Sequence, residues 1–154
     1  MRLKYVEEVR AFSRFYTVFS GILNKHFLKS KYTLVETRVM HSAYIKDGVM
    51  PSEIVTILNI DKSYLSRILT SLEKRKVIEK IESKKDGRSV NIRITNFGRH
   101  EFEKLTKASN KEVEGLLVNL TDAECERLVK KMHEIKELLE ASRSAQPVRS
   151  LKQR

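Results

Sequence analysis

The chain has 154 residues, with 31 Lys or Arg against 20 Asp or Glu, for a formal net charge of +11. This length favours one domain, and an apolar content of 40% is too high for a disordered chain. Few Gly and Pro argue against an all-β fold, and a single Cys excludes a disulfide framework or a multi-cysteine zinc site. No apolar run reaches the roughly 20 residues of a membrane span, and no signal-peptide core follows the N-terminus. We therefore expect a soluble, mostly helical, cytoplasmic protein whose partner is a polyanion.

The positive charge is concentrated in one part of the chain. Residues 1–95 contain 19 basic and 10 acidic side chains, whereas residues 96–141 contain 8 and 10. Residues 142–154 carry four basic side chains and no acid, and they lack any periodic pattern, which predicts a basic, disordered tail. A regional excess of charge indicates a binding face, although a solvated basic surface would have the same composition.

Residues 3–28 repeat apolar side chains at helical spacing in two adjacent rows. One row consists of Tyr5, Val9, Phe12, Tyr16, Phe19, Leu23 and Phe27, and the other of Ala11, Phe15, Val18 and Ile22. Together the rows are wider than one neighbouring helix would cover. We therefore expect a long helix that is buried partly against its own domain and partly against a second copy of the chain.

Two shorter helices and a tight turn are predicted next. The capping box Thr33-Leu34-Val35-Glu36 starts a helix over about 34–46. Pro51 suits a first helical turn, where its missing N–H would have no partner, and so predicts a short helix over 52–58. Asn59 tolerates the left-handed conformation that a tight turn needs.

The following helix, over 62–75, has one apolar face and one polar face, and Asp61 can cap it. The apolar stripe consists of Leu65, Ile68, Leu69 and Leu72. The other face carries short hydroxyls and bases without an acid, namely Ser63, Ser66, Arg67, Thr70, Ser71 and Lys74. Phosphate would repel acids at this face, so the pattern is typical of a helix that reads the DNA major groove.

Beyond residue 76 the apolar spacing changes from helical to alternating. Residues 77–82 and 90–94 predict two strands, and the polar loop 83–89 between them contains an Asp-Gly turn signal. A short helix, a tight turn, a longer helix and a hairpin form a winged helix-turn-helix, over 33–95. Two further helices are expected within 96–141, the second starting at the capping box Thr121-Asp122-Ala123-Glu124.

Three signatures in this region resemble those of MarR-type regulators. Asp61-Lys62-Ser63-Tyr64-Leu65-Ser66-Arg67 resembles the start of that family's recognition helix, and Leu72-Glu73-Lys74-Arg75-Lys76-Val77-Ile78-Glu79 resembles the approach to its first strand. Asp86-Gly87-Arg88, followed by Ile94-Thr95 and Gly98, resembles its wing signature. Lys76 stands where the family usually has Gly, which predicts a small change in the angle at which the strand begins.

The resemblance implies a single MarR-like domain over 1–141 that forms homodimers through helices 3–28 and 96–141. It also implies a transcriptional regulator, without catalytic residues, that binds a pseudo-palindromic DNA duplex. Its two recognition helices would lie in successive major grooves, about 34–36 Å apart.

A finer resemblance concerns a MarR subgroup in which an acetyltransferase domain of the GNAT superfamily follows the winged helix. Val9-Arg10-Ala11-Phe12-Ser13-Arg14-Phe15-Tyr16-Thr17 and the stretch from Gly48 to Arg88 carry it. One alternative is therefore the DNA-binding or regulatory half of a bifunctional acetyltransferase whose catalytic domain is absent here. Another alternative is a winged helix that serves as a protein-interaction adaptor.

The predicted DNA contacts lie on helix 62–75 and in the wing. Arg67 is expected to contact a base, while Tyr64 either contacts a thymine methyl or packs within the protein. Arg88 is expected to enter the minor groove, with Asp86 orienting its guanidinium. The full set is Lys62, Ser63, Tyr64, Ser66, Arg67, Thr70 and Lys74 on the helix, and Lys84, Lys85, Asp86 and Arg88 in the wing.

Members of the family commonly bind a small effector between the dimerisation helices and the DNA-binding lobe. Tyr16, Phe19, Arg38 and His41 lie on segments that could line such a pocket, although aromatic residues at helical spacing are also typical of a core. We expect neither a metal nor a cofactor, because the four His show no His-x-x-x-His pair. Cys125 falls in the apolar stripe of the last helix, where a thiol is usually inert.

Overall fold

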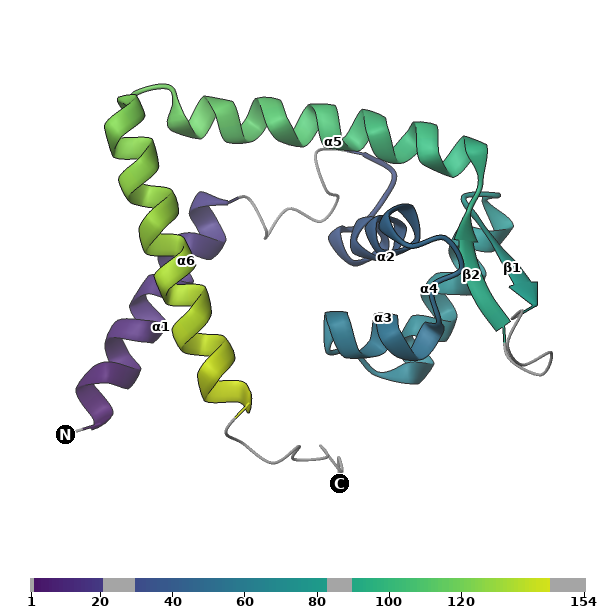
Figure 1. The fold of residues 1–154 in the computed structure, drawn as a ribbon, viewed down its shortest axis with the longest axis horizontal. Coiled ribbons are helices and arrows are strands. Elements are labelled where there is room, and N and C mark those ends of the chain that lie inside the picture. Colours follow the sequence, from purple (N-terminus) through teal and green to yellow (C-terminus); the bar gives the residue numbers. More distant parts are fainter. Residues whose placement is uncertain (1, 21–29, 83–89, 145–154) are drawn as a thin grey trace. The chain divides into compact units, whose positions relative to one another are not determined.

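The computed structural model describes residues 2–20, 30–82 and 90–144 of the chain (Figure 1). The elements in chain order are α1 (Arg2–Phe19), α2 (Leu34–Ile45), α3 (Pro51–Leu58), α4 (Lys62–Lys74), β1 (Ile78–Glu82), β2 (Val90–Ile94), α5 (Asn96–Leu117) and α6 (Asp122–Ser144). The predicted fold class, mostly helical with one small hairpin, is confirmed. Within these ranges, no helix is both long and apolar enough to cross a membrane.

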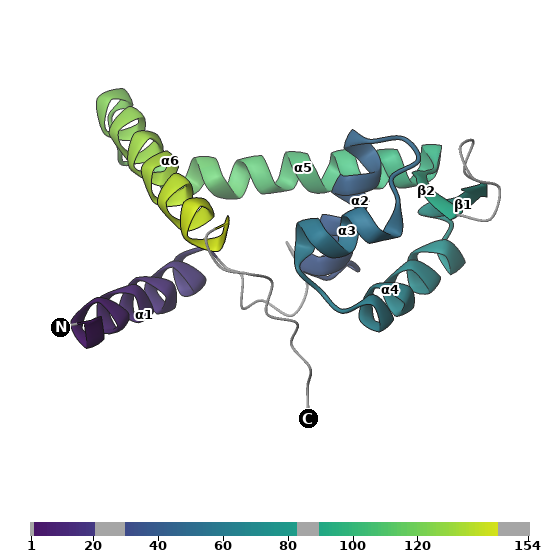
Figure 2. The same cartoon turned by 60° about the horizontal axis from the view of Figure 1, so that its bottom comes forward.

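The main core lies where α2, α3 and α4 pack together with the hairpin (Figures 1 and 2). Strand β2 contacts both α2 and α3, and β1 contacts α4. The largest side chains that are fully buried are Tyr32, Met40, Ile54, Leu65, Leu72, Ile78 and Ile92. All four apolar residues predicted for the 62–75 stripe are buried in this core, which confirms the orientation expected for α4.

The hairpin is antiparallel and pairs Ile78 with Ile94 and Glu82 with Val90. Val49 forms an isolated bridge to Ile92, whose N–H donates to the Val49 carbonyl over 2.8 Å. The segment between α2 and α3 therefore lies along the other edge of β2. This pairing fixes the base of the hairpin to the helix-turn-helix.

The turn between α3 and α4 has the predicted geometry. Asn59 adopts the left-handed conformation, with φ 50° and ψ 48°, and the Ile60 N–H donates to the Val55 carbonyl. Asp61 Oδ1 caps α4 by accepting from the backbone N–H groups of Tyr64 (3.0 Å) and Ser63 (2.7 Å). These two bonds favour the charged carboxylate and hold the pKa of Asp61 below its usual value.

Helix α4 ends in a Schellman motif centred on Lys76. The Lys76 N–H donates to the Glu73 carbonyl and the Val77 N–H to the Leu72 carbonyl, both over 2.9 Å. Lys76 has φ 58°, the left-handed conformation that Gly adopts with less strain. The structure thus accommodates Lys at this position by straining the residue and keeping the turn.

Replacing Lys76 by Gly is expected to stabilise the protein by about 0.5 kcal/mol. Relief of the left-handed strain, about 1–2 kcal/mol, outweighs the extra conformational entropy that Gly gives the unfolded chain, about 0.4–1 kcal/mol. Urea unfolding measures the difference. Lys74→Gly is the matched control, because Lys74 is helical, and it is expected to destabilise by about 1 kcal/mol. Equal destabilisation by both substitutions would contradict the proposed strain.

Residues just before α2 are tied to α5 through Glu101. Lys31 Nζ lies 2.8 Å from Glu101 Oε2, and the hydroxyl of the buried Tyr32 donates to the same oxygen over 3.2 Å. The bond from Lys31 is the main reason that the pKa of Glu101 lies below its ordinary value, and burial raises the pKa of Tyr32. The carboxylate thus stabilises the folded state only while it is charged.

Replacing Glu101 by Gln is expected to reduce the amount by which the free energy of unfolding decreases as the pH falls. Because the folded-state pKa of Glu101 is lowered, its contribution is complete above the unfolded-state value of about 4.3 and is lost as pH falls through the folded-state value. Thermal unfolding between about pH 5 and pH 3 measures this contribution. Glu112→Gln, the same change at an exposed residue of α5, controls for the loss of one charge. If the stability of both variants depends on pH as that of the wild type does, the contacts of Glu101 with Lys31 and Tyr32 do not contribute to the acid dependence.

The chain divides into two compact units, Met1–Asn110 and Lys111–Arg154, and the single domain over 1–141 stays a prediction. The boundary falls within α5, and the main core lies entirely within the first unit. Helix α6 extends to Ser144, three residues beyond its predicted end at 141. Residues 145–154 of the predicted tail lie outside the described part of the chain.

Helix α1 has no buried residue, so the prediction that it packs partly against its own domain is wrong for 2–19. Its aromatic side chains stack on one another instead, with centroids 5.9 Å apart for Phe12 and Tyr16 and 5.6 Å apart for Phe15 and Phe19. The helical pattern correctly identified an apolar face but could not say what covers it. The predicted continuation over 21–28 lies outside the described residues.

Candidate nucleic-acid interface

The face of α4 opposite the core is exposed and carries no acidic side chain. Its exposed residues are Lys62, Ser63, Tyr64, Ser66, Arg67, Thr70 and Lys74, which are all seven helix positions predicted from the sequence. The apolar stripe that holds α4 in the core sets this orientation. The face therefore offers hydroxyls, ammonium groups and one guanidinium to solvent from a rigid helix.

Arg67 and Tyr64 form a cation–π pair on this face. The guanidinium carbon lies 5.6 Å from the centroid of the Tyr64 ring, one helical turn earlier, and 39% of the Tyr64 surface is exposed. The nearby Thr70 hydroxyl donates to the Ser66 carbonyl over 3.0 Å, which leaves its lone pairs as acceptors. Arg67 is thus the main donor of the face.

Ser71 does not belong to this face, contrary to the sequence prediction. Its side chain is half-buried, and its hydroxyl donates to Glu36 Oε1 on α2 over 3.4 Å. The Arg75 guanidinium forms an ion pair with the same carboxylate, donates to the Lys31 carbonyl over 3.3 Å, and lies over the Tyr32 ring. Glu36 also completes the capping box of α2, so one carboxylate fixes the end of α4 to the start of α2.

The base of the wing is held at Thr95 and Gly98. The Thr95 hydroxyl donates to the Lys76 carbonyl over 2.7 Å and accepts from the Gly98 N–H over 2.9 Å. A Cβ atom on Gly98 would lie 2.0 Å from the carbonyl oxygen of Val77, so only Gly fits there. Sequence reasoning noted Thr95 and Gly98 only as part of a signature, and this close approach supplies the physical reason.

A second attachment of the hairpin, which sequence reasoning missed, joins Arg93 to Asp47. Arg93 Nε lies 2.7 Å from Asp47 Oδ1 and Nη2 lies 3.1 Å from Oδ2, a bidentate pair that raises the pKa of Arg93. The two residues are 46 positions apart, which explains why local patterns gave no signal. The predicted wing contacts, Lys84, Lys85, Asp86 and Arg88, lie outside the described residues.

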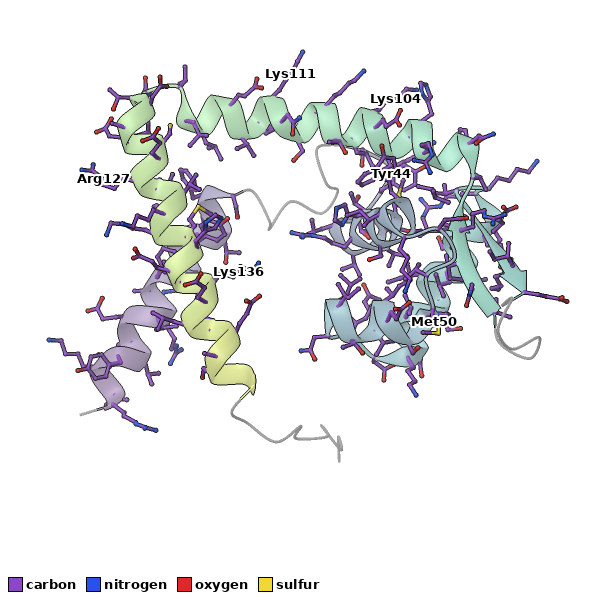
Figure 3. The ribbon with its side chains drawn as sticks, in the orientation of Figure 1. Tyr44, Met50, Lys104, Lys111, Arg127 and Lys136 are labelled. Atoms are coloured by element: carbon purple, nitrogen blue, oxygen red, sulfur yellow. The ribbon has the colours of Figure 1, made fainter. Side chains whose placement is uncertain are left out.

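The candidate effector residues lie on two helices. Arg38 and His41 are exposed on α2, and Tyr16 and Phe19 are exposed on α1. His41 packs against Phe102 of α5, with ring centroids 5.8 Å apart. Its neighbour Tyr44, which is directed towards α5 in Figure 3, lies 4.9 Å from Phe102. The effector pocket stays a prediction.

The described residues contain no group of three or more His, Cys, Asp or Glu side chains that could hold a metal ion. Cys125 on α6 is free and partly exposed rather than buried. No metal centre therefore competes with α4 as the candidate site in this part of the chain.

A helix-turn-helix whose second helix is followed by a paired two-stranded hairpin defines the winged helix-turn-helix class of proteins. Residues 32–90, which span nearly all of this winged helix, match the MarR family. This stretch of the chain is therefore similar to the MarR family.

Two relatives match over similar stretches. The HTH-type transcriptional regulator PapX of Escherichia coli is 37% identical over 97 residues, which are 57% of this chain and 59% of the relative. The HTH-type transcriptional regulator BilQ of Clostridioides difficile is 27% identical over 87 residues, 56% of this chain and 59% of the relative. The chain thus covers about three fifths of the length of these curated relatives.

Solved structures with the same fold include two DNA complexes. FabT of Streptococcus pneumoniae in complex with DNA matches with a TM-score of 0.73 and 18% identity, over 89% of this chain and 98% of FabT. A mutant of MarR from Escherichia coli complexed with operator DNA matches with a TM-score of 0.71 and 20% identity, over 88% of this chain and 97% of MarR. At these identities the similarity establishes the fold of this chain and nothing finer.

Proposed function

We propose that the chain is a sequence-specific transcriptional regulator that binds double-stranded DNA as a homodimer. The exposed, acid-free face of α4, held by a buried apolar stripe, carries this proposal. In the bound state residues 62–75 occupy the major groove, and the wing at 83–89 reaches the minor groove. The names of the two HTH-type relatives and the two DNA complexes that share the fold support it.

The homodimer is supported by the apolar surfaces of α1 and α6. Their exposed side chains include Leu3, Tyr5, Val9, Phe12, Phe15 and Val18 on α1, and Val129, Met132, Ile135, Leu138 and Leu139 on α6. Exposed apolar surface of this kind, on either helix, is typical of an interface, because each Å² removed from water contributes about 25 cal/mol. A second copy of the chain would cover it and place two α4 helices about 34–36 Å apart, the spacing of successive major grooves.

Three finer points belong to the same proposal. A regulator of this kind acts in the cytoplasm, where its DNA is, and it needs no catalytic residue or cofactor of its own. A small effector bound near Tyr16, Phe19, Arg38 and His41 would act by changing the spacing of the two α4 helices. The resemblance to the acetyltransferase-linked subgroup stays a prediction.

Selection of bound duplexes from random DNA, combined with sedimentation of the complex, tests the proposal. We expect enriched duplexes with two half-sites related by two-fold symmetry, each bound by two copies of the chain; an enriched duplex is called the selected duplex below. Arg67→Ala is expected to weaken binding to the selected duplex about 30- to 2×10⁴-fold, because a homodimer loses one bidentate base contact of about 1–3 kcal/mol per chain, while the variant stays folded. Failure to enrich any sequence, or a strictly monomeric chain, would overturn the proposal.

A further inference from the structure

The pairing of Tyr64 with Arg67 carries an inference about which bases α4 reads, and this inference rests on the proposed function. Both side chains lie on the exposed face, and the guanidinium carbon is 5.6 Å from the ring centroid. A guanidinium over an aromatic ring is held by the ring's negative face and loses part of its rotational freedom. Arg67 is therefore oriented before DNA arrives.

Arg67 keeps its hydrogen-bond donors available. Among the described residues it forms neither a hydrogen bond nor an ion pair with a carboxylate, in contrast to Arg75 and Arg93, which do both. A free, oriented guanidinium matches the O6 and N7 acceptors of guanine, which it can contact with two parallel bonds. Guanine is therefore the base we expect Arg67 to read.

The position of Tyr64 limits the neighbouring base pair. The ring centroid lies 5.6 Å from the guanidinium carbon, which exceeds the spacing of about 3.4 Å between successive base pairs, so the ring can reach the pair next to the one that Arg67 contacts. The edges of the bases in the major groove carry one apolar group, the C5-methyl of thymine. An aromatic ring that is 39% exposed gains most from covering that methyl.

We propose that Tyr64 and Arg67 read a guanine and an adjacent thymine as one unit. Arg67 bonds to guanine O6 and N7, and the ring of Tyr64 covers the C5-methyl of the thymine on the neighbouring base pair. Tyr64 thereby acts as a specificity-determining residue through its ring, and its hydroxyl is dispensable. A hydroxyl bond from Tyr64 to a phosphate is the competing role, and it would carry no sequence information.

The test replaces single thymines of the selected duplex by deoxyuridine, which lacks only the C5-methyl. For the wild-type chain, deoxyuridine next to the guanine read by Arg67 is expected to weaken binding about fourfold, the factor for one buried methyl-sized group. Deoxyuridine at the other thymines of the same duplex is the matched control and leaves affinity unchanged. To locate this guanine, each guanine is replaced in turn by 7-deazaguanine, which lacks N7. The guanine that Arg67 reads is the one whose replacement weakens DNA binding by the wild type but not by Arg67→Ala.

Two variants of Tyr64 separate the ring from the hydroxyl. Tyr64→Phe is expected to keep the fourfold preference for thymine, and Tyr64→Ala is expected to bind thymine and deoxyuridine duplexes equally. Because the side chain is exposed rather than part of the core, circular dichroism and thermal unfolding should show both variants folded.

The inference is overturned if the wild type binds both duplexes equally, or if Tyr64→Phe loses the preference, which would assign the role to the hydroxyl. It is also overturned if the selected half-sites contain no thymine beside the guanine. These outcomes all require a selected duplex, whereas failure of the proposed function appears earlier, as the absence of any enriched sequence.

Discussion

Replacing Gly98 by Ala is expected to destabilise the winged helix by about 3 kcal/mol, the upper end of the usual cost of overpacking. The new Cβ would lie 2.0 Å from the Val77 carbonyl oxygen, 2.8 Å from its carbon and 3.0 Å from Ile94 Cγ1. The carbonyl cannot move away freely, because it accepts from the Thr95 N–H over 3.1 Å. Relief therefore requires α5 to shift away from the hairpin, which breaks contacts of the buried Ile94.

Gly115, on the same helix, provides the matched control for this substitution. A Cβ there meets nothing within 4 Å, so Gly115→Ala is expected to stabilise by about 0.5–1 kcal/mol through better helix propensity. Urea unfolding of both variants measures the two free energies, which should have opposite signs. Similar small effects from both would show that α5 and the hairpin are not in close contact at Gly98.

Features that depend on a few consecutive residues were predictable from the sequence. The capping box at Thr33, the left-handed turn at Asn59 and the cap at Asp61 all have the expected geometry, because each is set by local hydrogen bonds. The burial of the α4 stripe followed from helical periodicity alone. These local features are sufficient to orient the exposed face of α4. The sequence could therefore predict which residues of α4 are exposed.

The features that escaped prediction join residues far apart in the sequence. Ser71 was assigned to the outer face because its neighbours are polar, but it faces Glu36, 35 positions earlier. The Arg93–Asp47 pair depends in the same way on β2 lying beside the end of α2. Periodicity also cannot identify the partner of an apolar face, which is why α1 was wrongly expected to pack on its own domain.

Conformation at Lys76 is an intermediate case. The sequence shows Lys at a position where MarR-type regulators, which this region resembles, usually have Gly. It does not show whether the Lys would adopt the left-handed conformation or the turn would change. The Schellman hydrogen bonds and the burial of Val77 and Leu72 favour the turn, so the Lys adopts a strained φ of 58°. Tertiary packing here overrides a local conformational preference.

Affinity for the selected duplex is expected to fall about 10³- to 10⁵-fold between 50 mM and 200 mM salt, if a dimer neutralises about six to ten phosphates. Lys62 and Lys74 are exposed at the two ends of α4 and form no ion pair among the described residues, so they suit phosphates on either side of the groove. Each released counterion contributes about 0.9 to the slope of log K against log salt. The size of this slope therefore counts the phosphate contacts of the complex.

Lys74→Ala is expected to reduce that slope by about 2, because a homodimer loses one phosphate contact per chain. It should weaken selected and unrelated duplexes alike, whereas Arg67→Ala should weaken mainly the selected one, since phosphate contacts carry no sequence information. Lys107→Ala, which removes the same exposed charge from α5, is the matched control and should leave the slope unchanged. Equal effects of the two Lys variants would mean that general charge attracts the duplex, and a slope near zero would mean that the basic winged helix does not meet phosphates.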